Sequence, residues 1–255
     1  MPCRSAEFFY MDHDSVSDEY VGPVGPLVLS GEITTGDYAA LLSKILGDEN
    51  RFLAQNKIIL ASDGGDVAEA LKIAQLVKSL HSRLSVGPLT GRCVSACFYI
   101  YAAAAEREVD GEKLLGINRP FIADTETAAA TEPAAATEAA AAAQAAVAAV
   151  ESMALRQVRA FLQDNAVPSY LVDEMFRHAS DDAYWLSADD EKNLGSRSQS
   201  FKHFLAAKCA WDEKLEREVY AGKRPVDELR RLLKCKDGAT RHAAHQALLA
   251  ARQDH

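Results

Sequence analysis

The chain has 255 residues, a formal net charge of −9 at pH 7 and a hydrophobic content of 48%. That length can bury one enzyme-sized core and leaves room for a small module beside it. The acidic balance argues against the broad basic surface that binds nucleic acid, and no apolar run approaches the roughly 18 residues needed to span a bilayer. We therefore expect a globular protein with no nucleic-acid partner and no transmembrane segment.

Residues 27–122 show short apolar runs that alternate with helical patterns. The first run ends at 28–29, further segments of strand length lie at 57–61, 83–87 and 114–117, and the helical patterns lie at 35–45, 67–77 and about 93–104. Strands that alternate with helices are typical of βαβ units, in which helices cover both faces of a mainly parallel sheet. The predicted fold class is therefore α/β, and residues 1–26 are assigned to an N-terminal extension.

The composition changes sharply at residues 123–150, which are mostly alanine with scattered Thr and Glu and a single proline, Pro133. Alanine favours helix but offers little surface for packing into a core. We predict a variable, low-complexity insertion that is flexible before Pro133 and helical after it.

The segment after the insertion returns to an ordinary helical pattern. Pro168 is placed to begin a helix that ends near His178. Ser187 is suited to cap the next helix, and Gly195 to end it. The α/β domain, with its insertion, is therefore predicted to extend over residues 27–196.

Residues 197–255 are predicted to be a small helical tail. Their pattern is helical and charged, and breaks at 222–225 and at Gly238 divide it into two or three helices. Cys209 and Cys235 could bridge two of these helices if the protein is exported, and they would remain thiols in a reducing cytosol.

The other three of the five cysteines lie near the N-terminus and in the α/β domain. Cys3 leaves the count odd, and no pair has the C-x-x-C spacing of a metal site. Cys93 and Cys97 are spaced i, i+4, which places both on one face of the predicted helix 93–104. We favour buried thiols that act as small hydrophobes over a redox pair, because residue type alone sets no reactivity.

Two glycine-bearing turns, each after a strand and before a helix, are the candidates for chemistry. Gly65 lies in the first turn, and Ser95 stands just past Gly91 in the second, 30 residues further on. Backbone N–H groups at such turns point into the crevice at the carboxyl ends of the strands, where an oxyanion would bind. Taken alone, the glycine pair also fits an ordinary tight turn.

The two turns and their surroundings resemble the Clp protease proteolytic subunit and its exported bacterial relatives, within the wider crotonase-like group. The order and spacing of the motifs agree over residues 27–122 and 151–196, so the insertion and the tail fall outside the resemblance. The matching segments are 29–33 with 36–37, 62–67, 93–97, 115–120 and 184–195.

The resemblance implies a serine hydrolase site on stacked ββα units with a mainly parallel sheet. Carried over position by position, it makes Ser95 the nucleophile and assigns the backbone N–H groups of Gly65 and Ala96 to the oxyanion hole. These N–H groups act whatever side chains the residues carry.

The chain departs from the family at the general base. Asn118 stands where the peptidases have the histidine that takes the proton from serine, and an amide cannot act as a base near neutral pH. The acid position falls just before Trp185, where Asp182 or Asp181 is available and Ala183 occupies the aligned place. The Ser–His–Asp mechanism in its usual form is therefore broken here.

Other polar residues are weaker candidates for chemistry. Some relatives use a lysine as the base, but residues 121–191 contain none. His178 could turn toward the crevice, although a histidine near a helix end more often caps or faces solvent, and Lys113 is read as a solvated charge. His242 and His245 lie i, i+3 with no third ligand nearby, so no metal site is predicted.

These features lead to three alternative functions. The first is a Clp-protease-like serine peptidase whose catalysis is impaired or lost at Asn118. The second is a non-catalytic member that binds peptides or serves in assembly, and the third is a crotonase-like protein that binds acyl thioesters through its two N–H groups.

The family implies a peptide or protein substrate, no cofactor and a homo-oligomer. Relatives with the Cys-x-Ser-x-Cys pattern are often exported, so the periplasm or cell envelope is expected, with the cytoplasm as the alternative. The start of the chain lacks the apolar region of a signal peptide, which neither shows nor excludes export.

Overall fold

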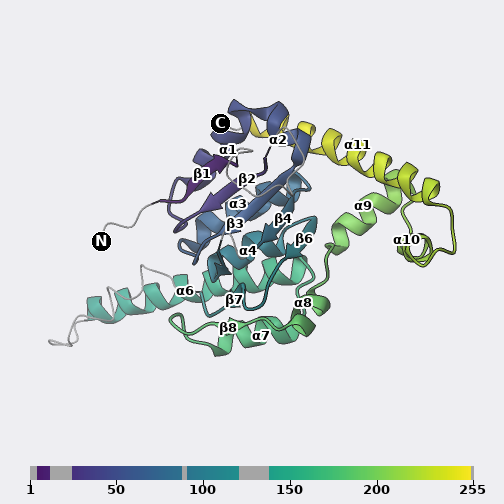
Figure 1. Cartoon of the computed structure of the whole chain (residues 1–255). Helices are drawn as coiled ribbons and strands as arrows, with labels where there is room; N and C mark the ends of the chain where they lie inside the picture. Colours follow the sequence, from purple (N-terminus) through teal and green to yellow (C-terminus); the bar gives the residue numbers. More distant parts are fainter. Residues whose placement is uncertain (1–4, 12–24, 88–90, 121–137, 254–255) are drawn as a thin grey trace.

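The computed structural model describes residues 5–11, 25–87, 91–120 and 138–253. It confirms an α/β fold with two sheets (Figure 1). The larger sheet has the order β1-β2-β3-β4-β6, with β1 (Glu7–Tyr10), β2 (Leu27–Ser30), β3 (Lys57–Ala61), β4 (Arg83–Val86) and β6 (Glu106–Val109). The smaller has the order β5-β7-β8, with β5 (Cys93–Val94), β7 (Leu115–Ile117) and β8 (Tyr184–Trp185).

The larger sheet is mainly parallel, and the smaller one is mixed. In the larger sheet β2, β3, β4 and β6 run parallel, and β1 pairs antiparallel with β2 at the edge. In the smaller sheet β5 and β7 are parallel, and β8 returns antiparallel to β7. The mainly parallel sheet that the alternating pattern predicts is therefore present, and its strands β2 and β3 are largely apolar, as expected of a sheet that is covered on both faces.

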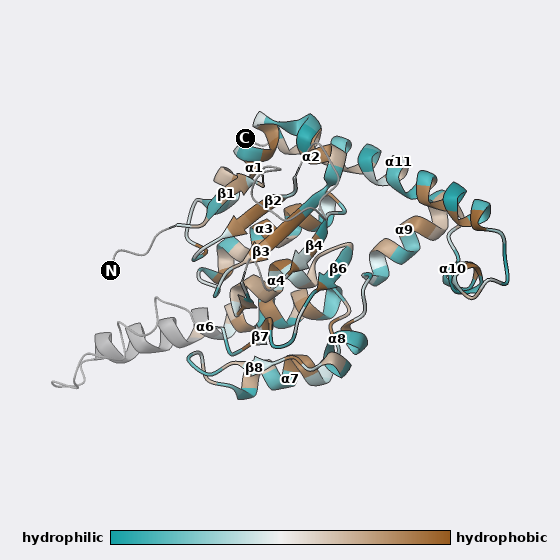
Figure 2. Cartoon of the chain, viewed as in Figure 1, coloured by the Kyte–Doolittle hydropathy of each residue, from teal (hydrophilic) through white to brown (hydrophobic). Residues whose placement is uncertain are grey.

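The main core lies between the larger sheet and the helices that follow β2, β3 and β5. These helices are α1 (Asp37–Gly47), α2 (Glu49–Gln55), α3 (Val67–Ser79) and α4 (Ala96–Ala102). Figure 2 shows β2 and β3 as apolar strands among these helices. Every residue of α4 is buried, and α4 packs against α3 on one side and against β5 and β7 on another. The residue before α4, Ser95, is thereby held next to the core.

The helices after the insertion follow the predicted order. They are α6 (Glu138–Asp164), α7 (Ser169–Arg177) and α8 (Ala188–Leu194). Ser187 caps α8 in a reciprocal capping box with Asp190, and Gly195 follows its last turn, as predicted. The helix predicted after Pro133 is confirmed from Glu138 onward, whereas residues 123–137 of the insertion lie outside the described residues.

The tail has three helices, α9 (Gln199–Cys209), α10 (Glu213–Tyr220) and α11 (Val226–Ala251). The break predicted at 222–225 is confirmed, but the one at Gly238 is wrong, because α11 continues through this residue. Open space surrounds Gly238. The only effect of this glycine on the helix is its modest intrinsic cost in helix stability, which does not end α11. Cys209 and Cys235 form a disulfide between α9 and α11, which confirms the bridged alternative.

The tail has a small apolar cluster of its own and also returns to the main core. The cluster is formed by Ala105, Phe201, Leu205, Trp211, Val219 and Leu229. Figure 1 shows α11 running back from this cluster to α2, and Ala244 and Leu248 on α11 belong to the main core. No helix among the described residues is long and apolar enough to cross a membrane.

Candidate functional site

Ser95 lies in a sharp turn between β5 and α4, with φ 56° and ψ −124°. A residue with a side chain in such backbone geometry costs on the order of 1–3 kcal/mol and persists only where its surroundings enforce it. Here the amide of Ser95 donates to the carbonyl of Gly116 at 3.1 Å, and its carbonyl accepts from the amide of Phe98 at 2.9 Å. A strained strand-to-helix turn is the backbone form that exposes a nucleophilic serine in hydrolases.

A disulfide joins Cys93 to Cys97 on either side of Ser95, with their Cα atoms 5.3 Å apart. The prediction that these residues are thiols on one helical face is wrong. Cys93 belongs to β5 and only Cys97 to α4, so the reversal of the chain at Ser95 brings their side chains together. Both residues are fully buried. The spacing alone suggested a helix because a turn of this kind also places positions i and i+4 close together.

The first glycine turn is hydrogen-bonded to the segment that leads into Ser95. The amide of Ser62 donates to the carbonyl of Arg92, and the amide of Val94 donates to the carbonyl of Ser62, both at 2.9 Å. A Cβ atom on Gly64 would lie 2.7 Å from the Cβ of Ser95 and 3.0 Å from the amide nitrogen of Ala96. Glycine is therefore required at position 64, because the turn passes directly against the nucleophile position.

The two predicted oxyanion donors have no acceptor in the part of the chain that the structure describes. Neither the N–H of Gly65 nor that of Ala96 donates to a described residue. Gly65 is also fixed in place, since a Cβ there would lie 2.1 Å from the carbonyl oxygen of Ile33. Asp66, the next residue, caps α3 by accepting from the amide of Glu69 at 2.9 Å. The turn is thus rigid. Its free donor, the N–H of Gly65, comes immediately after Gly64, which lies against Ser95.

Asn118 follows β7 and is 5% exposed. Its Nδ2 donates to the carbonyl of Ser180 at 2.6 Å, and its Oδ1 is buried without a partner among the described residues. The side chain therefore holds the loop before β8. No described side chain is hydrogen-bonded to the Oγ of Ser95. A base for the serine is absent from the described part of this arrangement.

The two candidates for the acid, Asp181 and Asp182, precede β8. The register of β7 with β8 pairs Ile117 with Tyr184, which puts Ala183 opposite Asn118. The carboxylate of Asp182 instead lies 3.1 Å from Nδ1 of His178, and its side chain is 72% exposed. The structure thus brings Asp182 to His178 and assembles neither with Ser95.

His178 is nevertheless close to the end of β7 through the backbone. It caps the end of α7, as expected of a histidine at a helix end, and its carbonyl accepts from the amide of Arg119 at 3.1 Å. Its Nε2 lies 3.8 Å from a carboxylate oxygen of Glu174. Sequence reasoning did not find Ser180, whose carbonyl fixes Asn118, because a backbone acceptor carries no side-chain signal.

A groove of about 920 Å³ is lined in part by the glycine turn. Its wall includes Gly65, Lys113 and Trp185, whereas Ser95 and Asn118 do not line it. Arg92 also lines the groove, and it pairs with Asp63 through Nε at 2.5 Å and Nη2 at 3.2 Å. The Asp63 carboxylate raises the pKa of Arg92 through this hydrogen bond. The volume is within the range of ligand sites.

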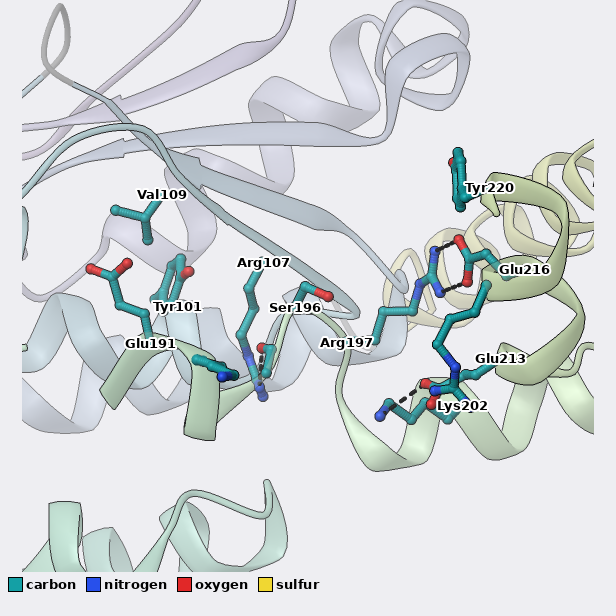
Figure 3. Close-up of a pocket in the computed structure, with 13 residues that line it drawn as sticks. Tyr101, Arg107, Val109, Glu191, Ser196, Arg197, Lys202, Glu213, Glu216 and Tyr220 are labelled. Carbon is teal, nitrogen blue, oxygen red and sulfur yellow. Dashed lines mark hydrogen bonds and ion pairs between the residues drawn. The ribbon is translucent and has the colours of Figure 1, made fainter. Parts of the chain in front are cut away.

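A second pocket, of about 630 Å³, lies at the junction with the tail (Figure 3). Its charges are largely paired, with Arg197 forked onto Glu216 and Lys202 on Glu213. The buried guanidinium of Arg107 donates to carbonyls at the ends of α4 and α8, where helix dipoles favour a cation. This pocket is therefore explained by the junction itself, and none of the predicted site residues lines it.

His242 and His245 both lie on α11. Nε2 of His245 lies 3.4 Å from Glu49 on α2. Among the described residues, no group of three or more His, Cys, Asp or Glu side chains could hold a metal ion.

No protein-family model and no curated protein matches the chain, so the site is interpreted from its own geometry.

Proposed function

We propose that this chain is a Clp-protease-like protein on a crotonase-type core whose Ser95 site binds peptide carbonyl groups but has lost the base needed for rapid hydrolysis. The observation that carries the proposal is the contrast between two parts of the site. The groups that bind a carbonyl oxygen are present, namely the strained turn at Ser95 and the free N–H groups of Gly65 and Ala96. The position of the base is held by Asn118, whose amide donates to the carbonyl of Ser180.

The chemistry of the proposal follows from which groups can act. A carbonyl oxygen placed between the N–H groups of Gly65 and Ala96 would accept two hydrogen bonds, and the same donors would stabilise an oxyanion. Attack by the Oγ of Ser95 also requires loss of its proton, for which a positioned base typically supplies a factor of about 10²–10⁴. Without that base we expect binding with little turnover, and no cofactor is needed for either.

A second candidate function is an active serine hydrolase in which His178 supplies the base. It is favoured by the pair that Nδ1 of His178 makes with Asp182 at 3.1 Å, which is how an acid orients a catalytic histidine. The Nε2 atom now faces Glu174, so this candidate requires the ring to turn toward Ser95. Catalytic hydrogen bonds are often incomplete without substrate.

A fluorophosphonate probe, which reacts with activated serines, separates the two candidates. We expect the parent chain to be labelled no more than Ser95→Ala, and Asn118→His to gain labelling that Asn118→His/Ser95→Ala lacks. Labelling of the parent at Ser95 would contradict the loss of the base. If His178→Ala then removes that labelling, the second candidate is correct. Thermal unfolding of each variant controls for folding.

Two further proposals concern the binding of acyl thioesters and the cellular location. A rise in melting temperature with acetyl coenzyme A, but not with peptides, would favour thioester binding. The two disulfides support a location outside the reducing cytosol, so we propose the periplasm or cell envelope. The homo-oligomer implied by the family stays a prediction that light scattering can test.

A further inference from the structure

We propose that the disulfide between Cys93 and Cys97 positions Ser95, so that the acyl site forms only after these two cysteines have been oxidised. The inference rests on the proposed function, because it concerns the presentation of the same serine. It makes the two cysteines positioning residues, since their sulfur atoms lie in the core and do not contact a bound carbonyl group.

The first argument is that Ser95 does little to hold its own strained conformation. Its side chain makes no capping hydrogen bond at the start of α4, whereas Asp66 and Ser187 cap α3 and α8 with theirs. The turn is held by backbone hydrogen bonds to Gly116 and Phe98 and by the disulfide that encloses it. Of these, only the disulfide fixes both the strand side and the helix side of the turn covalently.

The second argument is the packing around the sulfur atoms. Cys93 and Cys97 have no exposed surface and belong to the main core. Reduction would place two S–H groups in an interior that has little spare volume. The turn at Ser95 lies between the two cysteines, and Ser95 is only half-buried. We therefore expect this turn to shift and make room for the two S–H groups. Such a shift would move Ser95 relative to the N–H of Gly65.

The oxidation is a thiol–disulfide exchange with a disulfide donor such as oxidised glutathione. The thiolate of one cysteine attacks the donor and releases one donor thiol, and the thiolate of the other then displaces the second. Two protons and two electrons leave the pair, and the donor becomes two thiols. Because both sulfur atoms are inaccessible in the folded chain, the exchange has to precede closure of the core, and a reductant requires its opening.

The competing explanation is that the bridge only adds stability. The bridge between Cys209 and Cys235 offers the matched control, since it joins tail helices and encloses no part of the Ser95 site. A purely stabilising role predicts similar behaviour of Ser95 after loss of either bridge. A positioning role predicts that only the bridge between Cys93 and Cys97 affects Ser95.

The test compares Cys93→Ala/Cys97→Ala with Cys209→Ala/Cys235→Ala in the full chain by hydrogen exchange. We expect the first pair to speed exchange of the Val94, Ser95 and Phe98 amides at least 10-fold, with the amides of β2 and β3 unchanged. The second pair should leave the three amides as in the parent. Unchanged exchange in the first pair would overturn the inference.

A second readout uses both pairs in the Asn118→His background with the fluorophosphonate probe. Labelling of Ser95 should fall at least 10-fold without the bridge between Cys93 and Cys97 and persist without the other. Equal labelling would overturn the inference. If Asn118→His is not labelled at all, the proposed function fails, while hydrogen exchange still decides the inference.

Should Cys93→Ala/Cys97→Ala fail to fold, the Asn118→His chain with its cysteines intact replaces it. It is refolded with oxidised glutathione or with a phosphine reductant. Labelling confined to the oxidised sample supports the inference if circular dichroism shows that the reduced sample is folded and if Cys209→Ala/Cys235→Ala behaves in the same way. Equal labelling of both samples, or loss of the whole fold in the reduced sample, overturns it.

Discussion

The α/β body and the helical tail each contain one disulfide, and the two bridges differ in what they close. The bridge in the body joins residues 4 apart, and the bridge in the tail joins residues 26 apart. In the chain-entropy model, loops of these lengths contribute about 2 and about 3.5 kcal/mol to stability. The shorter bridge surrounds a strained turn and gives less stability, so its main effect is local geometry. The longer one compensates for the small apolar cluster of the tail.

The body and the tail are joined by a partly buried carboxylate, that of Glu106, and its removal is expected to have the largest effect. Glu106 on β6 accepts from Arg83 at 3.2 Å, from Arg197 at 3.1 Å and from Lys236 on α11 at 3.0 Å. Glu106→Gln leaves these cations without their carboxylate, and we expect a loss of about 3–5 kcal/mol in urea unfolding. Glu108→Gln on the same strand is the control. Its side chain is 46% exposed, so it should cost less than about 1 kcal/mol, and equal losses would contradict the prediction.

The same residue predicts a dependence on pH. Burial alone would raise the pKa of Glu106, but the charges of Lys236 and Arg83 and the hydrogen bonds from Lys236 and Arg197 outweigh burial and hold it below its ordinary value. Its contribution is therefore complete above the pKa of about 4.3 that glutamate has in an unfolded chain. It is lost as the pH falls through the lower folded value. The difference in unfolding free energy between parent and Glu106→Gln should shrink accordingly in acid.

The second prediction concerns the two bridges, each measured alone. Cys93→Ala/Cys97→Ala retains only the tail bridge, and Cys209→Ala/Cys235→Ala only the body bridge. Adding a reductant during urea unfolding should cost the first variant about 3.5 kcal/mol and the second about 2 kcal/mol, because the longer loop gains more freedom. The reverse order would show that the short bridge is the main source of stability.

The smallest expected effect is a gain in the tail. Gly238 is exposed inside α11 with open space around it, so Gly238→Ala should stabilise the chain by about 0.5–1 kcal/mol in thermal unfolding. Gly222 has φ 70° after α10, and Gly222→Ala should destabilise by about 1 kcal/mol instead. A loss at Gly238 would mean that α11 bends there.

The elements predicted best are those whose pattern is local. The strands β2 and β3 are apolar runs, β4 alternates half-buried and buried positions, and the caps at Ser187 and Gly195 are local hydrogen-bond motifs. The strand β6 was missed because Glu106 and Arg107 look solvent-exposed. Arg107 is buried and Glu106 is partly buried, and each has partners far along the chain. The strand β5 was absorbed into the predicted helix because two residues carry no periodicity.

The parts of the candidate site that could be predicted are those set by local turns. The closeness of Gly64 to Ser95 follows from two turns at the same end of neighbouring segments. The disulfide could not be assigned from spacing, because it depends on where the helix begins. The bond from Asn118 to Ser180 depends on the path of the loop before β8, which the sequence leaves open.

The return of α11 to the main core also bears on the order in which the chain finishes folding. Ala244 and Leu248 belong to the same buried cluster as the strands and helices of the body, so this cluster is complete only when α11 has docked. Cys93 and Cys97 belong to it as well. The core that encloses their sulfur atoms is therefore completed by a helix that lies far along the chain from both.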